Sequence, residues 1–73
     1  MNHTFEYSSV LELKKACAER FPDHVHFHDG CGGQYFSLDE PNDALREFIC
    51  GYFRGLGLTA DFTGDGTVFT VSE

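Results

Sequence analysis

The chain has 73 residues, with 12 acidic and 5 basic side chains, and its formal net charge at pH 7 is −7. A chain of this length forms a single domain, residues 1–73, and its aromatic content of 15% supplies much of the apolar area that a small core needs. The acidic balance argues against nucleic acid and anionic membranes as partners, because both bind basic surfaces.

The cysteine spacing and the hydropathy indicate a cytoplasmic protein. Cys17, Cys31 and Cys50 form no C-x-x-C pair, so the sequence predicts neither a disulfide framework nor a zinc ribbon. Cysteines used in this way are typical of a reducing compartment. No apolar run reaches the roughly 18 residues of a membrane span. Residues 1–10 also lack the basic start and the apolar stretch of a signal peptide.

The first 22 residues predict a strand and then a helix. Residues 4–7 alternate between polar and aromatic side chains, as in a half-buried strand. We expect the helix to begin at Ser9, because Ser9 and Glu12 match a capping box, and to end before Pro22. Its apolar stripe at helical spacing consists of Val10, Leu13, Cys17 and Phe21.

The middle of the chain predicts a hairpin. Residues 24–28 alternate histidine with apolar side chains, and residues 34–38 form the partner strand. The glycine-rich residues 29–33 make a turn of ordinary hairpin length. Because successive side chains of a strand point to opposite faces, we expect Val25 and Phe27 in the core and the histidines on the other face.

A second amphipathic helix follows the hairpin. Asp39, Glu40 and Pro41 are typical of a helix N-terminus, since proline fits the first turn and acids complement the helix dipole. Gly55 and Gly57 are expected to end this helix. The apolar positions at i, i+3, i+4 and i+7 spacing are Leu45, Phe48, Ile49, Tyr52, Phe53 and Leu56.

The last part of the chain predicts two strands, residues 58–62 and 67–72, joined by a turn at residues 64–66. The full order is β-α-β-β-α-β-β, an α+β fold whose first six elements match the ferredoxin-like, split β-α-β pattern. This topology predicts two helices on one face of a mainly antiparallel sheet, with the last strand beside the fourth. The opposite face is then open to water or to a partner.

The histidine-rich strand and its turn carry a possible metal-binding pattern. His24, His26 and His28 share one strand face, and Cys31 follows in the turn. Residues two apart on a strand are roughly 6.5–7 Å apart, which lets two imidazoles converge on one ion. Nitrogen and sulfur ligands suit zinc or another transition metal. We predict a structural or regulatory metal site at these four residues. The alternative is a solvated polar sheet face.

Two further hypotheses concern the same region. Cys31, flanked by glycines and close to His28 in sequence, is a candidate reactive thiol for sulfur or redox chemistry, although acidic surroundings disfavour a thiolate. An open sheet face would instead suit a protein partner or a homodimer. We expect a small binding protein rather than an enzyme, because no catalytic triad or carboxylate pair has motif support. The expected polar residues of that face, besides the histidines, are Tyr35, Ser37, Thr59, Asp61 and Thr70.

Overall fold

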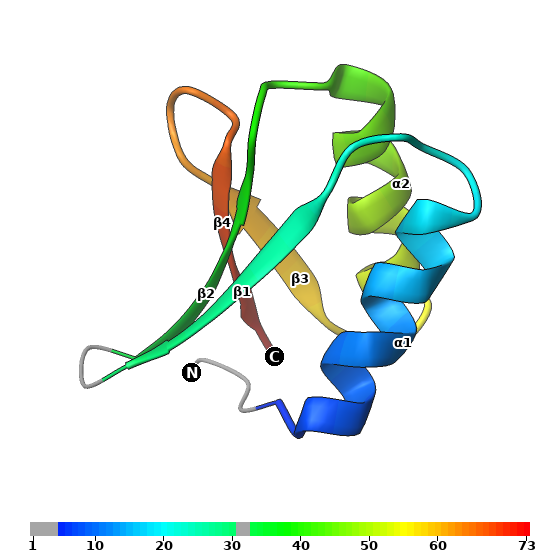
Figure 1. The fold of residues 1–73 in the computed structure, drawn as a ribbon. Coiled ribbons are helices and arrows are strands. Elements are labelled where there is room, and N and C mark those ends of the chain that lie inside the picture. The colour runs from blue at the N-terminus through cyan, green and yellow to red at the C-terminus, as the bar shows by residue number, and fades with distance from the viewer. Residues whose placement is uncertain (1–4, 31–32) are drawn as a thin grey trace.

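The computed structural model describes residues 5–30 and 33–73, and the structural statements below concern these residues. Two helices and four strands build an α+β fold, as the sequence predicts (Figure 1). In chain order the elements are α1 (Tyr7–Ala18), β1 (Val25–Gly30), β2 (Gly33–Leu38), α2 (Asp43–Arg54), β3 (Thr59–Phe62) and β4 (Val68–Ser72).

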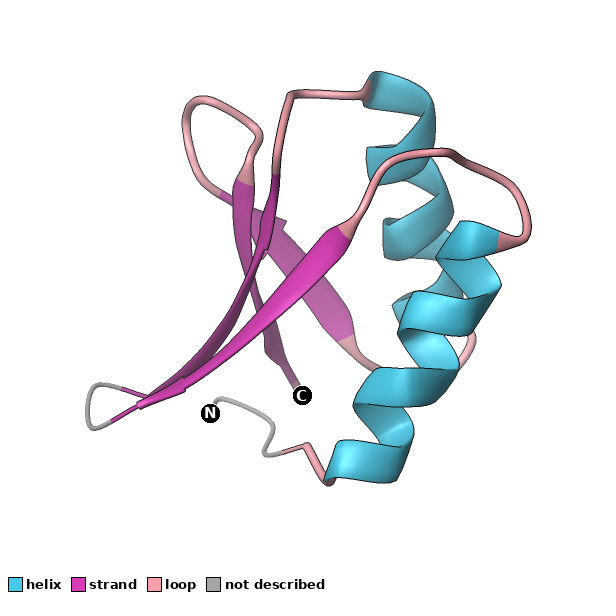
Figure 2. Cartoon of the chain, viewed as in Figure 1, coloured by secondary structure: helices cyan, strands magenta, loops and turns pink. Residues whose placement is uncertain are grey.

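The four strands form one antiparallel sheet in the order β1-β2-β4-β3. β1 and β2 pair along their whole length, from Val25 opposite Leu38 to Gly30 opposite Gly33. β4 pairs with β2 on one side and with β3 on the other. Because β2 and β3 both run antiparallel to β4, they are parallel to each other, and α2 carries the chain between them. Both helices lie on the same side of the sheet (Figure 2).

The strand predicted for residues 4–7 is wrong where the structure describes it. Tyr7 is the first residue of α1, and Phe5 precedes it without regular structure. The Phe5 N–H donates to Gln34 Oε1 at 2.7 Å, and Gln34 Nε2 donates to the Phe5 carbonyl oxygen at 3.3 Å. The side-chain amide of a β2 residue therefore binds the backbone of Phe5, which the sequence pattern places in a strand.

The ferredoxin-like order is not confirmed. The described elements run α-β-β-α-β-β, and the strand that should precede α1 is not found among them. β4 lies beside β3, as predicted, but it also pairs with β2 and so occupies the interior of the sheet. The strands at the two edges are β1 and β3.

Both helices begin at other residues than predicted. α1 begins two residues before Ser9, and the carbonyl oxygen of its N-cap, Glu6, accepts from the Ser9 N–H at 3.1 Å. The predicted capping box at Ser9 is therefore wrong. α2 begins at Asp43, later than predicted, because the side-chain oxygen of Asn42 caps it by accepting from the Leu45 N–H at 3.1 Å.

The end of α2 agrees with the predicted glycine stop. Arg54 is the last helical residue and Gly55 is the C-cap, while Gly57 has a φ of 79°, which favours glycine. Leu56, expected on the apolar stripe, lies beyond the helix and is 62% exposed, so that expectation is wrong. Neither described helix is long and apolar enough to span a bilayer.

The core lies between the helices and the sheet and centres on three buried phenylalanines. The rings of Phe36 and Phe69 stack with centroids 4.9 Å apart, and Phe53 of α2 packs 6.4 Å from each. Val25 is buried and Phe27 packs against the core, which confirms the predicted alternation of β1. The buried residues are Val10, Leu13, Cys17, Val25, Phe36, Leu38, Leu45, Ile49, Phe53, Phe69 and Val71.

Candidate functional site

The sheet face opposite the helices carries the candidate site. The register places His28 opposite Tyr35 and His26 opposite Ser37, while the intervening pair of phenylalanines points into the core. We call this surface the open face. Its members on the four strands are His26, His28, Tyr35, Ser37, Thr59, Asp61, Val68, Thr70 and Ser72. All of them are exposed or half-buried.

An aromatic pair stands on the open face. The imidazole of His28 stacks on the ring of Tyr35, with centroids 4.5 Å apart and an interplanar angle of 11°. The Nε2 atom of His28 lies 2.8 Å from Ser37 Oγ, so a hydrogen bond orients the imidazole. Tyr35 remains 41% exposed. The three side chains form one oriented polar group that joins β1 to β2 and offers an aromatic ring to a ligand.

His26 has a partner beyond the end of β2. Its Nε2 atom lies 2.9 Å from Asp39 Oδ1, and both side chains are exposed. An exposed pair of this kind adds little to stability, because water and salt screen it. When Nε2 carries the proton, it donates to Asp39 and leaves Nδ1 free to accept a hydrogen bond or to bind a metal.

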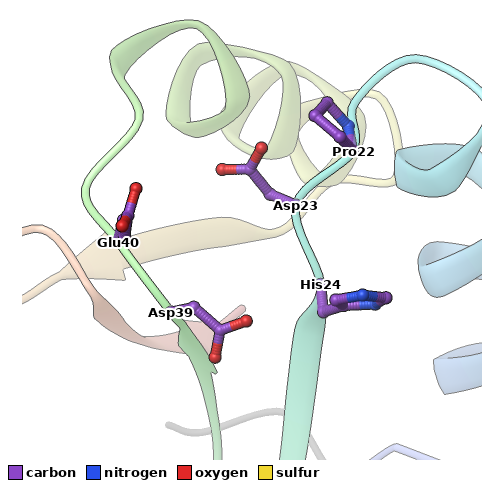
Figure 3. A pocket seen from close by; sticks show the side chains of 5 residues that line it. All are labelled: Pro22, Asp23, His24, Asp39 and Glu40. Carbon is purple, nitrogen blue, oxygen red and sulfur yellow. The ribbon is translucent and has the colours of Figure 1, made fainter.

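A shallow pocket of about 250 Å³ lies next to this pair, where the chain enters β1 and leaves β2. Three of its lining residues are acidic and none is Lys or Arg; they are Pro22, Asp23, His24, Asp39 and Glu40. In Figure 3 the Asp39 carboxylate points toward the start of β1, whereas the His24 ring points away from Asp39. The Asp23 carboxylate accepts a hydrogen bond from Asn42 Nδ2 at 3.2 Å. The pocket is therefore acidic, and one of its carboxylates is tied to the N-cap of α2.

The predicted metal ligands are brought together only in part. The rings of His24 and His26 have centroids 6.4 Å apart, whereas His28 is engaged with Tyr35 and Ser37. Across residues 5–30 and 33–73, no group of three or more His, Cys, Asp and Glu side chains is arranged to hold a metal ion. Cys31 lies outside the described residues, so its roles as metal ligand and reactive thiol stay predictions.

The two cysteines that the structure describes lie outside the open face. Cys17 is buried on α1, and burial raises the pKa of its thiol to about 11. Cys50 is half-buried on α2, and both are free thiols. Cys17 packs in the core, as its place on the apolar stripe predicts.

The sequence predicted the open face but not the hydrogen-bond partners of its histidines. The signal for Ser37 was available, because a hairpin register pairs it with His26 and sets it diagonally from His28. The sequence pattern instead places Asp39 at the N-terminus of the second helix. α2 begins later, at Asp43, so Asp39 lies before the helix, where it contacts His26.

Comparison with known proteins gives no match to this chain among protein-family models, curated proteins or solved structures. The function is therefore argued from the composition and geometry of the site.

Proposed function

We propose that this protein is a binding module that engages a protein partner through the open face of its sheet. The observation that carries the proposal is the composition of that face. Although the chain has a net charge of −7, Asp61 is the one residue of the open face that is charged when histidine is neutral. The centres of protein interfaces are depleted of charged residues and enriched in tyrosine.

The stacked pair on the open face supplies the anchor of the proposed interface. Tyr35 has few rotatable bonds, and its contacts with His28 restrict them further before any partner arrives. An anchor held in place beforehand loses less conformational freedom on binding. The hydroxyls of Ser37 and Thr70 provide adaptable hydrogen-bond donors and acceptors around it.

Photo-crosslinking tests this proposal with a matched pair of tyrosines. Tyr35 on the open face is 41% exposed, and Tyr7 on α1 is 74% exposed. Each is replaced in turn by p-benzoylphenylalanine, and the protein is irradiated in an extract of its source cells. We expect a discrete adduct from position 35 and none from position 7. The adduct should disappear when Thr70→Glu adds a charge to the same face. Equal adducts from both positions, or none from either, would contradict the proposal.

The cytoplasmic location predicted from the cysteines is part of the same proposal. It is supported by Cys17 and Cys50, which are both free thiols. Thiol labelling of intact cells with a membrane-impermeant reagent tests it. We expect no labelling until the cells are lysed, and labelling of intact cells would contradict a cytoplasmic location.

Metal binding on the histidine strand is a second candidate function. It is favoured by the 6.4 Å separation of the His24 and His26 rings, and by the hydrogen bond of His26 to Asp39. Carboxylates often orient metal-binding imidazoles in this way. Zinc titration of the parent protein tests it, with Cys50→Ser as the matched control for Cys31→Ser. We expect His26→Ala and Cys31→Ser to lose zinc while Cys50→Ser keeps it. No uptake by the parent with zinc in excess would contradict this function.

A further inference from the structure

We infer that the partner of the open face is a basic protein segment, rich in lysine and arginine. This inference rests on the proposed function and specifies the chemistry of the partner. It is carried by the distribution of charge between the two layers of the fold.

The helix layer, residues 5–20 and 43–54, contains every basic residue of the chain. These residues are Lys14, Lys15, Arg20, Arg46 and Arg54. The same layer contains five acids, which are Glu6, Glu12, Glu19, Asp43 and Glu47. Since acids and bases are equal in number, the helix layer is neutral overall.

The sheet layer, residues 21–30, 33–42 and 55–73, contains no lysine or arginine. It contains seven acids, which are Asp23, Asp29, Asp39, Glu40, Asp61, Asp65 and Glu73. The whole formal net charge of −7 therefore belongs to the layer that carries the open face.

Four acids border the open face at the end of the sheet where β1 and β4 begin and β2 ends. Asp23 precedes β1, Asp39 and Glu40 follow β2, and Asp65 lies in the turn before β4. Asp29 lies on the helix-side face of β1, because it alternates with His28. The His28–Tyr35 pair lies on the hairpin that leads away from these acids. An interface with an uncharged centre and a charged rim is typical of protein recognition, in which rim charges select and steer the partner.

Charge complementarity favours a basic partner over a second copy of this chain. A second copy docked on the same face would bring another acidic sheet layer toward the first. Charges on docked rims lie within or near the screening length of about 8 Å at physiological ionic strength, so they would repel each other. A small cation would satisfy the acids but leave the exposed ring of Tyr35 uncovered. In a lysine- and arginine-rich segment, the cationic side chains pair with the acids and the segment also covers the ring of Tyr35.

The experiment uses a fluorescent peptide of alternating lysine and threonine, with an alternating glutamine and threonine peptide as the uncharged probe. Two double variants each remove two negative charges, but from different layers of the fold. E40Q/D61N acts on the sheet layer, and D43N/E47Q acts on the helix layer. Binding to the full chain is followed by fluorescence anisotropy at low and at physiological salt. Amide chemical shifts then locate the peptide.

We expect the lysine peptide to bind, with shifts concentrated on β1, β2 and β4, and the uncharged peptide not to bind. E40Q/D61N should weaken binding by about threefold or more, whereas D43N/E47Q should leave it nearly unchanged. Equal weakening by both variants would mean that the peptide follows overall charge, and this would overturn the inference. Failure of the lysine peptide to bind would also overturn it, as would sedimentation showing that the chain dimerises through the open face. Each of these results would leave the proposed function standing if p-benzoylphenylalanine at position 35 still crosslinks to a protein, because crosslinking does not depend on the charge of the partner.

Discussion

The contact between Phe5 and Gln34 should hold the start of the chain against the sheet. Gln34→Thr removes both hydrogen bonds to the Phe5 backbone, while threonine keeps a good β propensity at this strand position. The Phe5 ring packs edge-on against Phe36 and Phe53, with centroid distances of 5.4 and 5.7 Å. Loss of the two bonds therefore weakens the hold on a ring that belongs to the core.

The expected loss of stability follows from these two bonds. A hydrogen bond contributes about 0.5–1.5 kcal/mol net, so Gln34→Thr should lower the free energy of unfolding by about 1–3 kcal/mol. For a domain of this size, each kcal/mol corresponds to about 4–8 °C in Tm. The m-value should not change, because the surface exposed on unfolding stays nearly the same.

Urea unfolding of four proteins measures this effect: the parent, Gln34→Thr, Phe5→Ala and the double variant. If Gln34 positions Phe5, then Phe5→Ala costs less stability in the Gln34→Thr background than in the parent. A Gln34→Thr midpoint equal to that of the parent, together with additive effects in the double variant, would refute the role assigned to this contact.

Three further predictions concern single side chains. Asn42→Ala should lower the free energy of unfolding by about 1 kcal/mol, because the cap of α2 is lost. Asn42→Ser should keep most of that stability, since serine also caps helices. Equal urea midpoints for the parent and both variants would contradict a capping role for Asn42. Because burial raises the pKa of Cys17 to about 11, iodoacetamide should label Cys50 before Cys17 in the native protein, and equal rates by mass spectrometry would contradict this. Hydrogen bonds from the Thr67 backbone and side chain lower the pKa of Asp65 below its usual 3.8. Asp65 therefore contributes stability that is present above pH 3.8 and is lost as the pH falls through its lower folded pKa. Asp65→Asn should flatten the fall of stability on acidification, and an unchanged acid limb in pH-dependent unfolding would argue against it.

The sequence predicted those parts of the fold that depend on local periodicity. The stripes of α1 and α2 and the alternation of β1 place Leu13, Ile49 and Val25 in the core, where the structure has them. The prediction of a strand at residues 4–7 is wrong where the structure describes these residues. The Phe5 N–H donates to the side chain of Gln34, 29 residues away in the chain, and local alternation gives no indication of such a contact. The pairing of β4 with both β2 and β3 also joins segments that are distant in the sequence, so the local pattern does not predict it.

The candidate site was likewise predictable from the sequence only in part. Alternation alone predicted that His26 and His28 share the face away from the helices, and the register confirms this. The contacts of these rings with Asp39 and Ser37 depend on how two strands align, which local spacing does not fix. The sequence also contains the separation of charge between the layers, because every lysine and arginine falls in one of the two helices, apart from Arg20, which follows α1 by two residues.

The most direct measurement is the mass and composition of whatever is crosslinked to position 35 when p-benzoylphenylalanine replaces Tyr35, beside the same substitution at Tyr7. We predict one adduct, at position 35, whose crosslinked peptide lies in a lysine- and arginine-rich segment of another protein. An adduct of twice the chain mass of 8.2 kDa would show that a second copy covers the open face. The absence of any adduct specific to position 35 would contradict the open face as a protein-binding surface.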